Sequence, residues 1–519
     1  MAQYLKLPQL HSRVFLYGIV LIIIISGTLK INQNIANKGQ GYFVLKNIDQ
    51  ANEAARLGYI KYEVNDYAEA FGLKWESKPG IRRIIRSGPD DFDDIGYISM
   101  LELIALGGKK MTLGLVEQLH NIVFILSLVM LAFAVRKLCN NIFAGWLFLI
   151  LALIFKKNIL SLVYGSPDSR TFVISFSCAV MFIIFSLNWL KKYFFTAKGS
   201  MAILFFGMIV GIMMLFRSSE GLAATCAIYF CIIFLNVKLR EKITSALIIF
   251  LGIFFVTIIL PIGFALHRDI KTGEFTGDLK PYLQTTGRHA AWHSLVAGLG
   301  RYPNSLGMRY SDIVLYDLVR AKYPKAMHPK LNIQGEGYYD VLQKIYFQYV
   351  ANHPIEYIKN VAQGYLELFY VIPYVTSVGN LPWFYGYLPI KPGVIPYERD
   401  KAWNVNGLVC LRLFYLRLSS TEWITFFLAF FSIAAAVVST FFGVPAKTYR
   451  GVFLAIVFYL FLLATQRALI PNHGLNFIVA FWIFSIISFL YICFTDNVAR
   501  YFFCHKLKVL IKNYKIRRL

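Results

Sequence analysis

The sequence predicts an all-α polytopic membrane protein with about ten to twelve transmembrane helices and two large loops on the outer side of the membrane. Three observations lead to this prediction. Of the 519 residues, 57% are hydrophobic and the mean hydropathy is +0.55, more apolar than a soluble protein of this length needs to be. Apolar runs of membrane-spanning length recur along the chain. Basic residues are concentrated in the short segments between these runs.

Ten runs are apolar over a length close to that of a membrane-spanning helix. Lys30 and Asn32 follow the first run in place of a small-residue cleavage site, so we expect a retained anchor and not a cleaved signal peptide. The runs lie near Val14–Leu29, Val116–Val135, Ile142–Phe155, Phe172–Leu190, Met201–Phe216, Gly221–Val237, Ile243–Leu266, Trp423–Val444, Gly451–Ala464 and Leu475–Phe494.

The formal net charge of +25 is explained by membrane topology and does not indicate a nucleic-acid partner. If the N-terminus is cytoplasmic, every short inner segment is basic, which is the positive-inside pattern of a chain with both termini in the cytoplasm. We therefore expect an integral protein of the bacterial inner membrane. The basic inner residues are Arg136, Lys137, Lys191, Lys192, Lys198, Lys238, Arg240, Lys242, Lys447 and Arg450.

Four regions follow from this pattern. The last, residues 498–519, is a basic cytoplasmic tail that we expect on the surface of anionic lipid. The other three are an N-terminal transmembrane module (1–266) with a long first outer loop (30–111), a large outer loop region with interfacial helices (267–422), and C-terminal transmembrane helices (423–497).

The loops are expected to contain helices of their own. The first loop has a helical pattern near 45–71, and a second helix is expected to start at 87–90, where Ser and Pro give a helix-start signal. The apolar residues from Ile95 to Ile104 would then lie along the membrane surface. In the second loop, Val361–Val378 is expected to be an interfacial helix, because one further span would place the basic tail outside.

The acidic run Asp90-Asp91-Phe92-Asp93-Asp94 is the leading candidate for a reaction centre. Four carboxylates in five residues are costly to crowd together unless they bind a cation or take up protons. Asp90 and Asp91 also suit a helix N-terminus, where they would only stabilise the helix. Asp93 and Asp94 fall on different faces of the predicted helix, so at most one is a catalytic base, and Asp94 is the first choice.

Other polar residues collect in the outer loops of the predicted topology. Arginine binds phosphate oxygens through a bidentate fork, and a carboxylate can accept the proton of an attacking hydroxyl. This combination suits a phosphorylated lipid substrate. The candidate substrate-binding residues are Asp168, Arg217, Glu220, Arg288, His289, His293, Arg467 and His473.

Simpler explanations exist for several of these residues. Asp168 can cap the next helix. Arg217 and Glu220 can pair with each other across a short turn, although charges flanked by two spans are usually functional. His289 and His293 have the i, i+4 spacing of a metal-binding pair, but no Glu follows His289, which favours ordinary loop histidines or one histidine that binds an acceptor.

This arrangement resembles the GT-C superfamily of integral-membrane glycosyltransferases, which use polyprenyl-phosphate-linked sugars. Asp93-Asp94 match the essential acidic position of that family's long first outer loop, and Asp168 matches a second acidic position in the next outer loop. The resemblance covers the first four spans, and the rest of the chain agrees in general layout. It implies a GT-C-like fold.

The expected activity is inverting transfer of a sugar from a polyprenyl-phosphate-linked donor to an acceptor hydroxyl at the outer face. Asp94 or Asp93 would be the general base, and Asp94 and Asp168 are hard oxygen ligands that can hold Mg²⁺ or Mn²⁺. The sequence has no nucleotide-binding glycine pattern, so no nucleotide cofactor is expected. The expected partners are the donor, a glycan, lipid or protein acceptor, and membrane lipids, without nucleic acid.

Two other functions remain open. An O-antigen-type polymerase or ligase would place the catalytic residues at Arg288, His289 and His293. A transporter of lipid-linked glycans would show charges within the spans and a repeated half.

Overall fold

The computed structural model describes twelve parts of the chain, and every regular element within them is a helix, as expected for an all-α protein. The described residues are 41–61, 95–163, 172, 174–275, 277–279, 289–300, 304–308, 312–327, 337–377, 420–442, 449–469 and 475–495.

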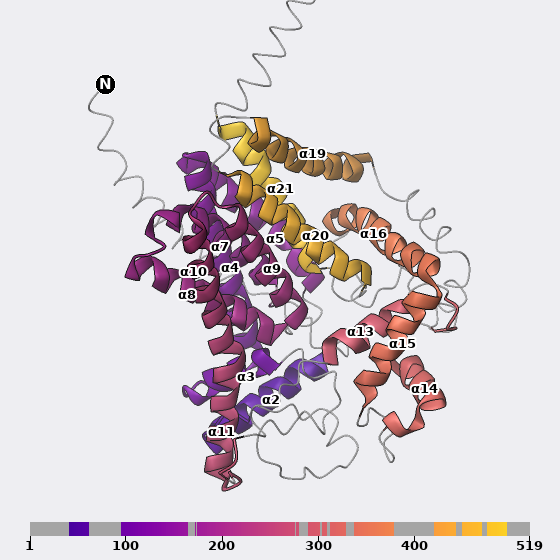
Figure 1. Cartoon of the computed structure of the whole chain (residues 1–519). Coiled ribbons are helices and arrows are strands. Elements are labelled where there is room, and N and C mark those ends of the chain that lie inside the picture. Colours follow the sequence, from indigo (N-terminus) through magenta and orange to yellow (C-terminus); the bar gives the residue numbers. More distant parts are fainter. Residues whose placement is uncertain are drawn as a thin grey trace, which may run out of the picture.

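The predicted apolar runs from Val116 onward all form helices, and these helices make up the main bundle (Figure 1). The first run, Val14–Leu29, lies outside the described residues. The bundle helices are α4 (Leu113–Cys139), α5 (Ile142–Val163), α7 (Ile174–Leu190), α8 (Ala197–Phe216), α9 (Ser218–Phe234), α10 (Leu239–Phe254), α19 (Ser420–Phe442), α20 (Arg450–Leu469) and α21 (Leu475–Phe494).

Three helical segments are long and apolar enough to cross a membrane by length and composition. They are Leu113–Cys139, Ala197–Phe216 and Leu239–Thr272. Shorter apolar stretches such as Ile142–Ala152 and Val479–Phe494 accompany them. This agrees with the membrane character expected from the composition.

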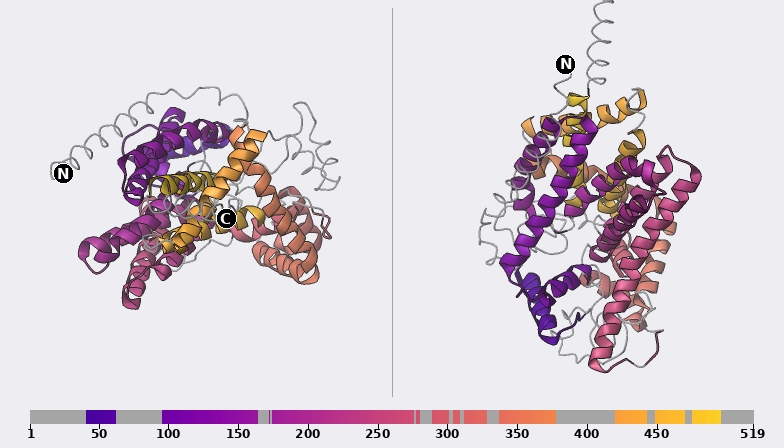
Figure 2. Two further views of the ribbon diagram at one scale, coloured as in Figure 1. Left: turned by 90° about the horizontal axis from the view of Figure 1, so that it is seen from above. Right: turned by 90° about the vertical axis from the view of Figure 1, so that its left-hand side faces the viewer.

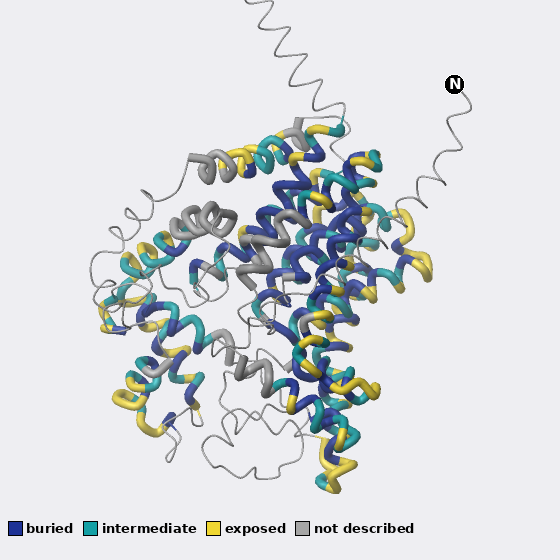
Figure 3. The backbone as a smooth tube through the Cα atoms, turned by 180° about the vertical axis from the view of Figure 1, so that it is seen from behind, coloured by how far each residue is buried: buried dark blue, intermediate teal, exposed yellow. Residues whose placement is uncertain are grey.

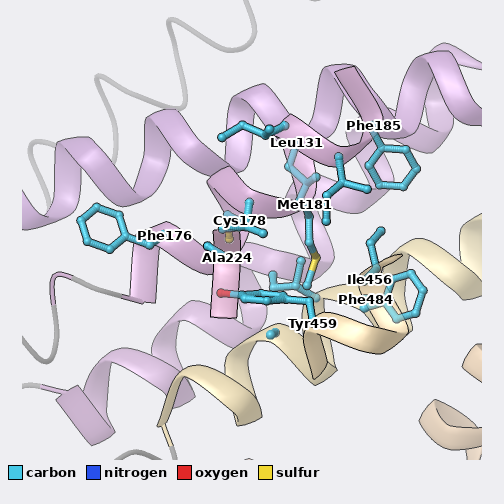
Figure 4. Close-up of a cluster of buried hydrophobic side chains, with 14 of the residues drawn as sticks. Leu131, Phe176, Cys178, Met181, Phe185, Ala224, Ile456, Tyr459 and Phe484 are labelled. Atoms are coloured by element: carbon cyan, nitrogen blue, oxygen red, sulfur yellow. The ribbon is translucent and has the colours of Figure 1, made fainter. Parts of the chain in front are cut away.

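Helix α7 is the centre of the bundle and contacts α4, α8, α9, α20 and α21. It is apolar on all sides, which is typical of a helix buried by its neighbours. Figure 4 shows its side chains Met181 and Phe185 among Leu131 of α4, Tyr459 of α20 and Phe484 of α21. All five are almost fully buried, so the core of the bundle forms around this helix.

Helices α8 and α10 approach each other closely because glycines lie at their contact. A Cβ atom added to Gly207 would lie 2.4 Å from the carbonyl oxygen of Ile249, and one added to Gly252 would lie 2.5 Å from that of Leu204. Small residues allow backbones to pack together in this way, and the close approach strengthens van der Waals contact between helices in a membrane.

Helix α10 continues through a π-helical turn, η5 (Phe255–Ile259), into α11 (Leu260–Thr272). The observed helix therefore extends beyond the predicted run Ile243–Leu266 at both ends, and its α11 end projects beyond the bundle (Figures 1 and 2). The projecting end is fixed to the segment after α2. There the Nη1 of Arg268 donates to the Lys61 carbonyl at 2.9 Å, and the Nζ of Lys271 donates to that of Gly58 at 2.9 Å.

The first long loop contains α2 (Gly41–Leu57) and α3 (Ile95–Leu106). The helix predicted near 45–71 is confirmed up to Leu57 and is wrong at residues 58–61, which are not helical. Gly58 has a φ of +74°, a left-handed conformation that ends the helix, and residues 62–71 lie outside the described part. The helix start predicted at 87–90 also lies outside it.

Most residues of helix α3 are buried against protein, and the prediction that this helix lies along the membrane surface stays a prediction. Tyr97, Ile98 and Leu101 are buried. The helix contacts α2 and α8, and the buried Gln50 of α2 donates to Glu102 of α3 at 3.0 Å. Contact with protein accounts for Tyr97, Ile98 and Leu101, whereas Leu103 of the same helix is 48% exposed.

The second loop region forms a small helical unit with a core of its own, which the sequence did not predict. It consists of α13 (His289–Leu299), α14 (Asp312–Lys322) and α15 (Tyr338–Asn352), and dark blue buried residues mark its centre in Figure 3. Helix α16 (Pro354–Ser377) follows and packs on α5, α19 and α20. The helix predicted over 361–378 is thus confirmed as a helix up to Ser377, although it begins earlier.

We expect Gly252→Leu to lower the stability of the protein, because the new side chain would meet the backbone of α8. Overpacking of this kind costs about 1–3 kcal/mol. Thermal unfolding of the purified protein in detergent is the measurement. Gly263→Leu is the matched control, since that glycine lies on the same long helix with nothing within 4 Å of an added Cβ. Equal melting temperatures for both variants would contradict the close packing of α8 and α10.

Candidate functional site

The bundle has two chemically different ends. At one end, which we call the α3 end, α4 and α9 begin while α8 and α20 finish, and Gly96 of α3 lies against Leu215. The opposite end carries the described basic residues that the sequence assigned to the inner segments. These are Arg136, Lys137, Lys191, Lys192, Lys198, Lys238, Arg240, Lys242 and Arg450.

A buried ion pair lies at the α3 end. The Nε of Arg217 is 3.4 Å from the Oε1 of Glu220, and their side chains are only 8% and 4% exposed. Arg217 is the one extended residue between α8 and α9, so the predicted tight turn is confirmed. Glu220 lies in the first turn of α9, where the helix dipole stabilises a carboxylate.

Three helices hold this pair in place. The Oγ of Ser219 donates to the Oε2 of Glu220 at 2.6 Å, and the Ser219 carbonyl accepts a hydrogen bond from the Nε2 of Gln466 on α20. Tyr459, two turns before Gln466 on α20, is an electrostatic neighbour of Glu220 and hydrogen-bonds Ser177 of α7. The pair is therefore part of a polar network inside an apolar bundle.

Gln466 contributes a hydrogen-bond acceptor to this network that has no partner among the described residues. Its Oε1 is buried and unbonded, while its Nε2 is used by Ser219. A buried acceptor without a donor costs roughly 1–3 kcal/mol.

His120 is a functional candidate that the sequence interpretation missed. Its Nε2 lies 2.9 Å from the hydroxyl of Tyr97, so it joins α4 to α3. The rings of Phe172 and Phe216 surround the two, with Phe216 directly before Arg217. The sequence could have indicated this residue, because His120 lies within the apolar run Val116–Val135, and ionisable residues in such runs are rare and usually functional.

Several predicted site residues lie outside the described part of the chain. Arg467 follows Gln466 on α20 and His289 begins α13, but only the backbone of these two is described. The residues with neither backbone nor side chain described are Asp93, Asp94, Asp168, Arg288 and His473.

His293 belongs to the core of the small helical unit. It is 5% exposed, its Nδ1 is 3.3 Å from the hydroxyl of Tyr338, and its ring packs near that of Tyr316. This environment suits a hydrogen-bonded core histidine. Within the described ranges, no group of three or more His, Cys, Asp or Glu residues is placed to hold a metal ion.

Comparisons with protein-family models, with curated proteins and with solved structures return no match for this chain.

We expect Arg217→Met and Glu220→Met to lower stability when made singly, because each leaves an unpaired charge in the bundle. Breaking a buried pair in this way costs about 3–5 kcal/mol, whereas replacing both partners with apolar residues is often neutral. The double variant should therefore unfold close to the wild-type temperature. The measurement is a double-mutant cycle from thermal unfolding in detergent. Single variants as stable as the wild type would contradict the buried pairing.

Proposed function

We propose that this chain is a membrane glycosyltransferase of the GT-C type. It transfers a sugar from a polyprenyl-phosphate-linked donor to an acceptor hydroxyl at the α3 end of a bundle of ten to twelve spans. The observation that supports this most strongly is the buried Arg217–Glu220 pair at that end. A guanidinium kept in an apolar bundle is a ready ligand for the phosphate of a lipid.

The distribution of charge supports an outer position for this site. The described basic residues that the sequence assigned to the inner segments lie at the opposite end, which by the positive-inside rule would face the cytoplasm. The α3 end would then face outward, where both long loops lie. The acidic run of the first loop ends at Asp94, the residue directly before α3. Gly96 of α3 packs against Leu215 of α8, which is two residues before Arg217 in the sequence.

The proposed reaction is a single displacement at the anomeric carbon. Asp94 takes the proton of the acceptor hydroxyl, and the oxygen forms the new bond as the bond to the phosphate oxygen breaks. Polyprenyl phosphate leaves with the electron pair, and the configuration inverts. Arg217 stabilises the charge on the leaving phosphate, and Glu220 holds the guanidinium in position before the donor binds.

The expected divalent cation would be held by Asp94 and Asp168, both outside the described residues. The polymerase or ligase alternative needs catalytic residues at Arg288, His289 and His293. Of these, His293 is buried against Tyr338, which is a less suitable position for chemistry on a large substrate.

We expect Asp94→Asn and Asp168→Asn to reduce sugar transfer by about 100-fold or more, as loss of a general base or its partner does. The measurement is transfer of labelled sugar from polyprenyl-phosphate donors by purified protein, with and without EDTA. The Arg217→Met/Glu220→Met double variant should be folded but inactive. Asp317→Asn is the control, because that carboxylate is 58% exposed on α14. Wild-type turnover by both Asp94→Asn and Asp168→Asn would refute the proposal.

We expect cysteines at the two ends of the long α10–α11 helix to differ in accessibility. In a background without native cysteines, Thr272→Cys should react with a membrane-impermeant maleimide added to intact cells, and Leu239→Cys should react only after permeabilisation. Both positions are exposed. The reverse pattern would place the α3 end in the cytoplasm and exclude an outer active site.

A further inference from the structure

A basic surface lies at the end of the bundle opposite the α3 end. It is formed by the short helix η4 (Lys191–Tyr193) and by the starts of α8 and α10, two helices that pack side by side (Figure 1). The Cζ of Arg240 lies over the ring of Phe195, 5.5 Å from its centre, so the segments before α8 and at the start of α10 are in contact. We call this surface the basic patch. Its charged residues are Lys191, Lys192, Lys198, Lys238, Arg240, Glu241 and Lys242.

The basic patch carries a large excess of exposed positive charge. Six of its seven charged residues are basic. The side chain of the acidic one, Glu241, accepts a hydrogen bond from the backbone N–H of Lys238 at 2.9 Å and so stabilises the start of α10. A group of exposed cations in one place attracts anions. The exposed cations are Lys192, Lys198, Lys238 and Arg240.

The backbone beneath the basic patch is tightly held. The Thr196 hydroxyl donates to the Tyr193 carbonyl at 2.9 Å and accepts from the Gly199 N–H at 3.1 Å. A Cβ atom added to Gly199 would collide with the same Tyr193 carbonyl, so the turn before α8 packs directly on the first turn of that helix. The basic side chains therefore project from a fixed backbone, which reduces the entropy lost when a ligand binds.

An exposed apolar surface continues from the basic patch along both helices. On α8, Met201 follows Lys198 by three residues and is 70% exposed. On α10, Ile243 and Leu247 follow Arg240 by three and seven residues and are 52% and 57% exposed. Residues at these spacings share one face of a helix. Each helix therefore presents a cation at its start and apolar side chains beyond it on the same face.

This order of charge and apolar surface matches an anionic phospholipid. The lipid phosphate would contact the basic side chains, and the acyl chains would cover the apolar stripes of α8 and α10. A soluble phosphate uses only the first feature. The headgroup of a zwitterionic lipid adds a cation of its own, which the basic residues repel.

We propose that the basic patch is a binding site for an anionic phospholipid. The phosphate lies among Lys192, Lys198, Lys238 and Arg240, and the acyl chains lie along Met201, Ile243 and Leu247. The inference is independent of the proposed glycosyltransferase function, because it concerns the opposite end of the bundle and a lipid that is not a substrate.

Native mass spectrometry of the full-length protein measures this binding directly. The probes are phosphatidylglycerol, phosphatidylcholine with the same acyl chains, and glycerol 1-phosphate, which has a phosphate without acyl chains. Wild type is expected to bind phosphatidylglycerol in preference to the other two. Lys198→Gln/Arg240→Gln should weaken that binding about 30-fold, since each basic residue near an anionic lipid surface contributes about a factor of five.

Three further variants separate the effect of charge from that of structure. Lys198→Arg/Arg240→Lys keeps both charges and should bind phosphatidylglycerol as wild type does. Lys192→Gln/Lys198→Gln leaves Arg240 in place and should weaken binding as much as the first double variant. Lys322→Gln/Lys325→Gln is the matched control, because it removes two exposed lysines at the end of α14 and just after it, and it should leave binding unchanged.

Several results would overturn the proposal. One is equal binding of phosphatidylglycerol and phosphatidylcholine by wild type. Another is wild-type binding of phosphatidylglycerol by both glutamine variants of the patch, with unchanged melting temperatures. Glycerol 1-phosphate bound as tightly as phosphatidylglycerol would also overturn it, because the patch would then be a site for a soluble anion.

Discussion

The buried ion pair between Arg217 and Glu220 is the interaction on which the α3 end of the structure depends. Two charges in an apolar bundle are tolerated only if they are paired and hydrogen-bonded, and that requirement determines the local architecture. The connection between α8 and α9 is a single extended residue, Arg217, and a hydrogen bond from Gln466 links α20 to this turn. The pair also gives the bundle a polar centre at the end where α3, His120 and Tyr97 lie.

The remaining architecture positions this centre. Helix α7 supplies a core that neighbours from both halves of the chain share. Glycine contacts bring α8 and α10 together, and the extension of α10 into α11 reaches the first loop through Arg268 and Lys271. The small unit of α13, α14 and α15 adds a second hydrophobic core beside the bundle.

The fold was largely predictable because its signals are local. Apolar length alone located α4 through α10 and α19 through α21, and the charged turn at Arg217 was evident between two runs. Features that depend on tertiary contact were not predictable. The burial of α3 against α2 and α8 gives the same apolar pattern as a helix on a membrane surface. Tyr316, Tyr338 and Tyr349 are amphipathic, so their shared core with His293 could not be distinguished from an exposed loop.

In the candidate site too, features with a local signal in the sequence were predictable and features that depend on tertiary contact were not. Arg217 and Glu220 were predictable because charges are rare beside apolar runs, and their mutual pairing was one of the two explanations considered. The hydrogen bond from Gln466 to the turn and the position of Tyr459 beside Glu220 were not predictable, since a neutral polar residue gives no signal until its partner is known. His120 could have been found, because its position inside an apolar run was visible.

The most direct test of this account is a structure of the protein in lipid nanodiscs with a polyprenyl phosphate bound. We expect the phosphate at the α3 end, within about 2.7–3.2 Å of the Arg217 guanidinium, which would have turned from Glu220 toward it. A phosphate bound among the lysines at the opposite end, with the Arg217–Glu220 pair unchanged, would contradict the central claim.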